Sequence, residues 1–546
     1  MNIRLFLTNA LLLLTLLVNA QQPQSKTQIN AQKFATTLFL IDNFYVDTVN
    51  SDKVVEDAIA AALKELDPHS AYISKKDVEK ANEPLVGSFE GIGVTFQLIR
   101  DTITVIGPTP GGPSEKVGIM AGDQFIKIDG ENAFGKKVDN EYVQKHLRGK
   151  KGTKVTVSVK RGRDKELIDF EIIRDKIPLN SINAAFMMEK QVGYIKLDRF
   201  AQDSDKEFKT ALEKLQAQGM KSLILDLRSN SGGYLNTAID MVDEFLGANQ
   251  LIVYTEGLKS KRQEWKSSEK GCYTEGNLVV LIDEGSASAS EILSGAVQDH
   301  DRGVLIGRRS FGKGLVQRPF NLPDGAMIRL TTARYHTPTG RCIQRPYEGG
   351  TEEYYKEMTK RLERGEYFHA DSIHFPDSLR YRTDKGRIVY GGGGIMPDLF
   401  VPLDTTKYSP YHRNLVAKGV LNKFIMKYLE NNRNSLNTLY PTQNVSDKEK
   451  KSSFEKFNES FQISDADIEQ LVEAGEKEKV ERNQEQLDAS MNLIKKQIKA
   501  NIARDLWTNN EYFQIMNTEN DIFNKAVQVL STQSSYKNAL HRKRGK

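Results

Sequence analysis

Four short apolar runs in the middle of the chain constrain its fold more than any other feature. The runs VGYIKL, SLILDLR, NLVVLIDE and GVLIGR are strand-like, and amphipathic stretches such as DKEFKTALEKLQAQG and ASEILSGAVQDH separate them. Alternation of apolar strands with helices indicates an α/β layered core with parallel strands. We predict this core over residues 177–404, with the polar, tyrosine-rich residues 346–390 as a surface insertion.

The segments on either side of the core have a different character. Residues 21–86 carry apolar residues at three- and four-residue spacing, which predicts an N-terminal helical region. Residues 87–176 are short strands and turns, and residues 405–546 are charged, amphipathic and helical. The expected fold class is therefore a multidomain α/β protein, with an inserted β-rich domain and helical regions at both ends.

The first twenty residues predict export. MNIR gives a positive start, an apolar stretch runs from Leu5 to Val18, and small residues precede a cleavage point after Ala20. The stretch is shorter than the roughly 20 residues that a membrane-spanning helix needs. We expect a signal peptide at residues 1–20 and a periplasmic or cell-envelope location; an uncleaved anchor is the alternative.

Composition argues against two classes of ligand. A formal net charge of +5 over 546 residues gives no case for nucleic acid. Neither Cys272 nor Cys342 has a second Cys or His at ligand spacing, so no metal and no other cofactor is expected. In an oxidising compartment the two thiols could pair or stay free, and the sequence leaves both open.

Residues 307–314, GRRSFGKG, match the first seven positions of a phosphate-binding loop and fail at the eighth, where Gly314 replaces the hydroxyl. A phosphate loop also needs a helix directly after the lysine. Here prolines and an Asp-Gly pair punctuate two strand-like runs, which predicts a hairpin. Nucleotide binding is therefore the weakest hypothesis, and Lys313 needs another partner.

The segment LIDEGSASASEIL predicts a strand, a turn of small residues and a helix. Such a turn can expose a nucleophile while backbone N–H groups form an oxyanion hole. Ser286, Ser288 and Ser290 compete for this role, although Ser290 also suits a helix cap. His300 lies twelve residues beyond Ser288, roughly 18 Å along one helix at about 1.5 Å per residue, so a Ser/His pair is not expected.

Several motifs together resemble the carboxyl-terminal processing peptidases, or tail-specific proteases, which use a Ser/Lys dyad. SASASEILSGAVQD is followed by FGKGLVQ, with LDPHSAY and LDLRSNSGG before them and TTARYHTPTGRCIQ and GGIMPD after, over roughly residues 30–403. The resemblance implies that Ser288 is the nucleophile, Lys313 the general base and Gln317 the residue that orients it. Asp299 is expected to support the fold near the site.

The implied chemistry makes two physical demands. A lysine base must be neutral near pH 7, so its pKa must fall about three units from about 10.4, roughly 4 kcal/mol of differential desolvation. An oxyanion hole needs backbone donors, for which Ala289 and either Gly232 or Gly233 are the candidates. Ser231 stands where the family more often has proline, which leaves the geometry of that loop open.

Residues 87–176 have the strand order of a PDZ-like domain. The resemblance is carried by the segment GGPSEKVGIMAGDQFIKIDG and by a match to the carboxylate-binding loop at Gly91, Ile92, Gly93 and Val94. PDZ domains hold the free C-terminus of a peptide on successive backbone N–H groups. Arg148 either adds a charge near this groove or is a solvated loop cation.

These observations lead to one principal hypothesis: an exported serine endopeptidase that recognises a C-terminal tail through its PDZ-like domain and cleaves by acylation of Ser288. Its expected partners are proteins or peptides with free apolar C-termini. The resemblance also implies that the protein self-associates through the N-terminal helices and that an adaptor protein activates it. The alternative is a catalytically inert PDZ scaffold that binds protein C-termini.

Overall fold

The computed structural model describes residues 25–99, 101–109, 111–135, 137–162, 166–442 and 444–541, and the expected signal peptide lies outside them. The chain divides into two units, which are described separately. The first holds residues up to 76 together with Pro319–Leu330, and the second holds Asp77–Arg318 and Thr331–Lys546. Among the described helices, none is both long and apolar enough to cross a membrane.

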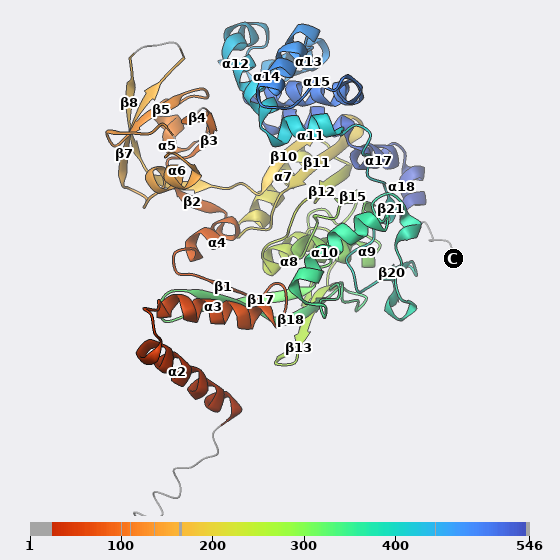
Figure 1. The fold of residues 1–546 in the computed structure, drawn as a ribbon. Helices are drawn as coiled ribbons and strands as arrows, with labels where there is room; N and C mark the ends of the chain where they lie inside the picture. Colours follow the sequence, from red (N-terminus) through yellow and green to blue (C-terminus); the bar gives the residue numbers. More distant parts are fainter. Residues whose placement is uncertain are drawn as a thin grey trace, which may run out of the picture. The chain divides into compact units, whose positions relative to one another are not determined.

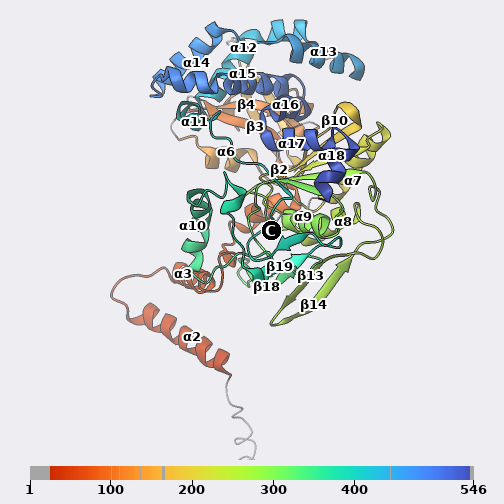
Figure 2. The same cartoon turned by 90° about the vertical axis from the view of Figure 1, so that its right-hand side faces the viewer.

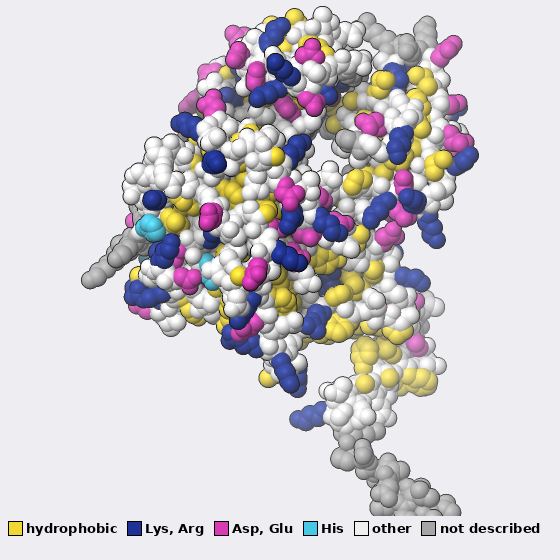
Figure 3. All heavy atoms as spheres, turned by 180° about the vertical axis from the view of Figure 1, so that it is seen from behind, with side chains coloured by type: hydrophobic (Ala, Val, Ile, Leu, Met, Phe, Trp, Pro, Cys, Tyr) yellow, Lys and Arg dark blue, Asp and Glu magenta, His cyan; other side chains and the backbone are white. Residues whose placement is uncertain are grey.

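The first unit contains two helices and a short strand pair. Helix α2 (Lys26–Phe44) starts with a capping box on Ser25, and α3 (Ser51–Lys64) follows it. Strand β1 (Ala71–Ile73) pairs antiparallel with the first residues of β18 (Met327–His336). The N-terminal region is therefore helical, as predicted. Helix α2 has no buried residue, and its apolar side chains are visible beside the grey segment in Figure 3.

A six-stranded sheet forms the core of the second unit. Its four predicted strands are parallel neighbours, and the edge strand β10 is antiparallel to β11. The strands, in order across the sheet, are β10 (Ile182–Met187), β11 (Val192–Leu197), β12 (Ser222–Asp226), β15 (Asn277–Ile282), β16 (Val304–Gly307) and β21 (Leu399–Phe400). The α/β layered core is thus confirmed.

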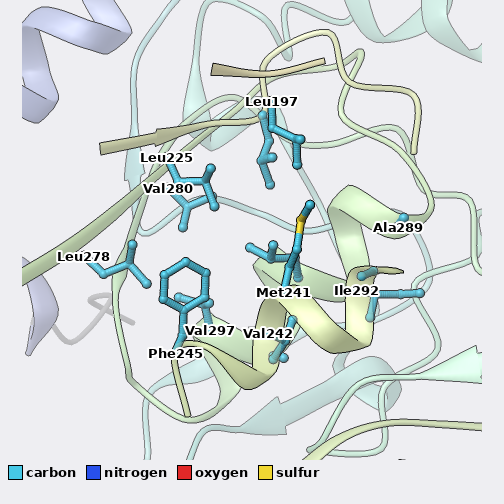
Figure 4. Close-up of a cluster of buried hydrophobic side chains, with 14 of the residues drawn as sticks. Leu197, Leu225, Met241, Val242, Phe245, Leu278, Val280, Ala289, Ile292 and Val297 are labelled. Carbon is cyan, nitrogen blue, oxygen red and sulfur yellow. The ribbon is translucent and has the colours of Figure 1, made fainter. Parts of the chain in front are cut away.

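Three helices cover one face of this sheet: α7 (Ser204–Ala217), α8 (Leu235–Asp243) and α9 (Ala289–Asp299). Figure 4 shows Leu225 and Val280 of the strands with Met241 of α8 and Ile292 of α9 in one buried cluster. Burial of each large apolar side chain contributes roughly 1.5–3 kcal/mol. This packing fixes the start of α9 at the carboxyl ends of the strands, where open α/β sheets place their ligand sites.

The opposite face of the sheet is covered by the end of the chain. Side chains alternate along a strand, so Ile224 and Val279 point away from Leu225 and Val280. They pack against α17 (Asp521–Leu530) and α18 (Gln533–Leu540), which lie together over the sheet in Figures 1 and 2. The preceding elements are α16 (Asn509–Met516) and the short 3₁₀ helix η4 (Asn517–Glu519).

The β-rich domain has its own sheet and its own apolar core. Helix α6 (Asn140–Leu147) packs on this core, and a separate ribbon joins β2 (Ser88–Gly91) to β9 (Asp175–Pro178). The sheet strands are β3 (Val94–Ile99), β4 (Thr102–Pro108), β5 (Gln124–Ile128), β6 (Glu131–Asn132), β7 (Lys154–Lys160) and β8 (Ile168–Ile173).

Five further helices after the core pack around another apolar cluster. They are α11 (Pro410–Ala417), α12 (Val420–Leu439), α13 (Asp447–Ser460), α14 (Asp465–Lys477) and α15 (Gln484–Leu506). The C-terminal region is therefore helical, as predicted. The tyrosine-rich segment contains α10 (Gly350–Glu363) and the hairpin of β19 (Arg380–Arg382) and β20 (Ile388–Tyr390).

The phosphate-loop pattern is followed by a strand. After Lys313 the chain enters β17 (Leu315–Asn321), which pairs with β18. A phosphate-binding loop requires a helix at this place to direct its dipole and N–H groups at the anion. The hairpin prediction is confirmed, and the arrangement is not that of a nucleotide site.

Candidate active site

The three serines of the turn between β15 and α9 differ in exposure and in hydrogen bonding. Ser286 and Ser290 are fully buried, and their hydroxyls donate to the carbonyls of Leu227 and Asn230, each at 2.8 Å. Ser288 alone is partly exposed. Its φ of 56° is in the left-handed region, which a non-glycine residue adopts only under constraint. Of the three hydroxyls, the turn therefore leaves that of Ser288 partly exposed.

Glu291 and Tyr335 hold the backbone of Ser288 in this conformation. The N–H of Ser288 donates to Oε2 of Glu291 at 2.8 Å. The hydroxyl of Tyr335 lies 3.1 Å from the carbonyl oxygen of Ser288. Both side chains are buried, so neither exchanges this contact for water.

The same two side chains hold the backbone of Lys313. Its N–H donates to the same Oε2 of Glu291 at 2.9 Å, and its carbonyl oxygen lies 2.7 Å from the hydroxyl of Tyr335. The backbone nitrogens of Ser288 and Lys313 can be no farther apart than the sum of their distances to that oxygen. The structure thus brings together the serine turn and the lysine loop, which are separate in the sequence.

Glu291 is the centre of this arrangement and was not among the residues predicted from the sequence. Its carboxylate accepts from four donors, since the N–H of Gly312 and the hydroxyl of Ser310 bind its second oxygen. Burial raises the pKa of Glu291, and the hydrogen bonds from Ser310, Lys313, Ser288 and Gly312 oppose that effect. A glutamate three residues after a helix-capping serine reads as an ordinary capping box, which conceals its second role.

Gln317 lies on β17, four residues beyond Lys313. Its amide nitrogen donates to the hydroxyl of Thr331 on β18 at 3.2 Å. This contact fixes the amide plane across the two strands and directs the nitrogen toward Thr331.

The glycine loop after β12 lies directly against the serine turn. A Cβ on Gly232 would approach the carbonyl oxygen of Ala287 to 2.7 Å and Cβ of Ser288 to 2.8 Å, and the φ of Gly232 is 98°. Only glycine fits there. The N–H of Gly232 donates to the side chain of Asn230 at 2.9 Å, so it is already engaged.

Two other backbone donors beside Ser288 remain for an oxyanion. Within the described parts of the second unit, no hydrogen bond takes the N–H of Ala289 or that of Gly233. Asn230 holds the loop in place through two hydrogen bonds of 2.9 Å. Its side-chain amide donates to the carbonyl of Leu197, and its backbone carbonyl accepts from the N–H of Ala287. Of the two expected glycines, Gly233 is the one with its donor available.

His300 is at the far end of α9 from Ser288. It is the C-cap residue of the helix, and its ring nitrogens lie 2.7 Å from a carboxylate oxygen of Asp384 and 2.7 Å from the carbonyl of Leu251. The neighbouring Asp299 is buried and accepts from Arg341 at 2.6 Å. Neither residue is placed to act on the serine hydroxyl.

The tyrosine-rich segment contacts the lysine loop from another side. Arg361 of α10 is fully buried, and its guanidinium donates to the carbonyls of Ser310 at 2.8 Å and Phe311 at 3.3 Å. Burial lowers the pKa of Arg361 to about 9, and the nearby Arg309 and Arg345 act in the same direction. Part of the segment that was expected to be a surface insertion therefore packs against the lysine loop.

The predicted carboxylate-binding loop, Gly91–Val94, joins β2 to β3. The carbonyl of Ile92 accepts from both the N–H and the hydroxyl of Ser114, at 3.0 and 2.7 Å, and Gly93 has a φ of 72°. Arg148 is not a solvated cation: it forms an ion pair with Glu83 and lies 4.6 Å above the ring of Phe89. A substrate carboxylate would have to compete with Glu83 for it.

Cys272 and Cys342 are both free thiols. Burial raises the pKa of Cys272 to about 12, and its hydrogen bond to Glu244 adds to the effect. Among the described residues, no group of three or more His, Cys, Asp or Glu side chains could hold a metal ion.

Comparison with protein families gives three matches. Residues 191–353 match peptidase family S41, residues 91–172 match the PDZ domain, and residues 411–508 match a family of unknown function. The first match spans the serine turn and the lysine loop, and the second contains the Gly91–Val94 loop.

Two curated relatives and one solved structure illustrate the similarity. A carboxy-terminal-processing protease of Bartonella bacilliformis is 36% identical over 349 residues, which are 62% of this chain and 79% of the relative. A probable CtpA-like serine protease of Staphylococcus aureus is 35% identical over 58% of this chain and 63% of the relative. The solved photosystem II D1 C-terminal processing protease is 28% identical, covering 57% of this chain and 89% of that one, with a TM-score of 0.33.

Proposed function

Because the chain belongs to peptidase family S41, as a carboxy-terminal-processing serine protease with a PDZ domain, we propose that it cleaves peptide bonds through a dyad of Ser288 and Lys313. The observation that carries this proposal is the shared anchorage of the two residues. Glu291 and Tyr335 hold both backbones, so the nucleophile and the base keep a constant relation to each other.

The proposed reaction is an acyl transfer in two stages. Neutral Lys313 takes the proton of the Ser288 hydroxyl as Oγ attacks the scissile carbonyl carbon. The negative oxygen that forms is stabilised by the N–H groups of Ala289 and Gly233. The Lys313 ammonium then protonates the leaving amine, and a water molecule, activated by the same lysine, hydrolyses the acyl-enzyme.

Gln317 has a supporting role in this mechanism. Its amide nitrogen is directed at Thr331, which leaves its carbonyl oxygen as the atom that can accept from the lysine. We assign to Gln317 the orientation of Lys313, while neutrality of the lysine comes from desolvation as substrate fills the site.

Substrate selection is assigned to the PDZ domain. The backbone N–H groups of the Gly91–Val94 loop are the proposed receptor for a free C-terminal carboxylate, and the tails it accepts are apolar and disordered. Arg148 contributes once a substrate carboxylate replaces Glu83 as its partner. The protease thereby recognises the C-terminal end of a substrate chain and cleaves a peptide bond upstream of it.

Export and self-association complete the proposal. The leader-like residues 1–20 support secretion to the periplasm or cell envelope. Ile29, Phe39 and Phe44 are each at least half exposed on α2, which supports association with a second copy. Sedimentation of the protein with and without Phe39→Asp tests the second point, since a monomer for both contradicts it.

One experiment tests the reaction itself. The wild type, Ser288→Ala and Lys313→Ala are incubated with an unfolded protein ending in apolar residues, and fragments are followed by mass spectrometry. Cleavage that both substitutions abolish supports the dyad, and its loss when the substrate C-terminus is amidated supports tail recognition. Cleavage that survives Lys313→Ala refutes the assigned base, and tail binding without cleavage by any form favours the inert scaffold.

A further inference from the structure

The end of the chain reaches the strand that leads into the proposed oxyanion loop. Asn517 is the first residue of η4, is only 3% exposed, and accepts a hydrogen bond from Nη2 of Arg228 at 3.2 Å. Arg228 belongs to the LDLRSNSGG segment, whose Gly232 lies against Ser288. A residue from outside the S41-matched region thus contacts the catalytic scaffold.

Arg228 is held on its other side by a buried acid. Asp226 is fully buried at the end of β12, and its Oδ1 accepts from the backbone N–H of Arg228 at 3.0 Å and from Nε at 2.9 Å. Its Oδ2 accepts from Nη2 of Arg228 and from the hydroxyl of Tyr194, the latter at 2.7 Å. Nη2 of Arg228 is therefore shared between Asp226 and Asn517.

The position of Arg228 sets the start of the glycine loop. Lys196 donates to the carbonyl of Arg228 at 2.6 Å. The next residue, Ser229, has a φ of 59°, and its N–H donates to Asp283 at 2.7 Å. A non-glycine residue with positive φ has few alternative backbone conformations. A displacement of Arg228 would therefore be passed on to the loop that follows it.

The terminal helices also contact Tyr194, which is a hydrogen-bond partner of Asp226. The ring of Tyr194 lies 6.3 Å from that of Phe513 on α16 and 5.6 Å from that of Phe523 on α17. Tyr194 in turn donates to Asp226. The last forty residues of the chain thus contact Arg228 directly, through Asn517, and Asp226 indirectly, through Tyr194.

We propose that Asn517 is a positioning residue for the cleavage reaction, acting through Arg228 on the loop that presents the N–H of Gly233. This inference rests on the proposed function of Ser288. It assigns to the C-terminal helices a part in the geometry of the oxyanion hole, in addition to covering the sheet.

A second asparagine of the same segment provides a matched control. Asn510 on α16 accepts from the N–H of Ala185 on the edge strand β10 at 2.9 Å. Like Asn517, it accepts one hydrogen bond from the second unit outside the terminal helices, but it is only partly buried and does not contact Arg228. Substitution by leucine removes one such bond in each case.

The experiment compares full-length wild type, Asn517→Leu, Asn510→Leu and Ser288→Ala on a peptide with a free apolar C-terminus. We expect Asn517→Leu to lower kcat about tenfold with KM unchanged, because a small displacement of the oxyanion donors acts on the transition state. A peptide boronate, which forms a tetrahedral adduct with a serine hydroxyl, should bind this variant more weakly by the same factor. Asn510→Leu should match the wild type in both measurements.

Asn517→Asp supplies the conservative variant, because it retains an oxygen that accepts from Arg228, and its kcat should stay within about threefold of the wild type. Equal losses in the two leucine variants, a loss confined to KM or to thermal stability, or a loss in Asn517→Asp equal to that in Asn517→Leu would overturn the inference. Full activity of Ser288→Ala would instead overturn the proposed function, whatever the asparagine variants do.

Discussion

Replacement of Glu291 by glutamine is the sharpest perturbation of the site, because it changes one heavy atom and leaves the shape intact. The carboxylate accepts from Ser288 and Lys313 on one oxygen and from Gly312 and Ser310 on the other. A glutamine keeps one acceptor oxygen and turns the other into a donor. The new N–H group must then face two of the four donors, which are either the partly buried N–H groups of Ser288 and Lys313 or the buried groups of Ser310 and Gly312.

The expected magnitude follows from this count. A buried donor left without an acceptor costs about 1–3 kcal/mol, so two of them cost about 2–6 kcal/mol. Burial of the charged carboxylate is itself unfavourable and raises the pKa of Glu291. A neutral glutamine avoids this cost, which recovers part of the lost free energy. We expect a net loss of about 3 kcal/mol in the free energy of unfolding. The loss of activity should be larger than the loss of folded protein, because both tethered loops shift.

Chemical denaturation measures the first quantity, and the rate of labelling of Ser288 by a fluorophosphonate measures the second. Glu284→Gln is the matched control, since Glu284 lies in the same turn and its partly exposed carboxylate pairs with the buried Arg308 at 2.7 Å. That change should cost less than Glu291→Gln, because a glutamine oxygen still accepts from Arg308. Unchanged stability and an unchanged labelling rate in Glu291→Gln would refute the claim that this carboxylate holds the serine and lysine loops together.

Four other outcomes are expected. Gly232→Ala should abolish cleavage, because its Cβ would overlap the serine turn, while a retained circular dichroism spectrum shows that the fold survives. Asp226→Asn should cost about 3–5 kcal/mol, since burial opposes ionisation of Asp226 but Arg228 and Lys196 hold its pKa well below the usual range. The same shift means that the stability supplied by Asp226 is present above pH about 4 and is lost as pH falls, which acid titration of the wild type and Asp226→Asn would reveal. With its pKa raised to about 12, Cys272 should react with iodoacetamide at pH 8 about a thousandfold more slowly in the native than in the unfolded protein, as followed by peptide mass spectrometry. Deletion of residues 509–546 should yield insoluble protein, because it uncovers one face of the sheet, and soluble active protein would contradict that role.

The sequence predicted the elements whose pattern is local. The four parallel strands are mostly apolar because both faces of the sheet are covered, and that pattern is visible without a structure. The serine turn could be identified in the same way, whereas the choice of Ser288 and Lys313 came from the family resemblance of their short motifs.

Pairings over long sequence distances were not predictable. Glu291 lies three residues after Ser288, and no local pattern indicates that Gly312 and Lys313, more than twenty residues away, also bind it. The sequence allowed Arg148 to be a charge near the groove or a solvated loop cation, but it did not predict the pairing with Glu83, which is 65 residues away. The terminal helices carry no motif, because covering a sheet requires only apolar side chains of suitable volume.

The two-sided cover of the sheet also has a consequence for the order of synthesis. The turn that carries Ser288 leaves the ribosome more than two hundred residues before α17 and α18, which close the second face. At about 5–20 residues per second, this interval is roughly 10–50 s. Throughout it the nascent chain has the turn of Ser288 on a sheet with one face still uncovered. A chain interrupted before α17 and α18 is therefore expected to expose the apolar side chains of that face.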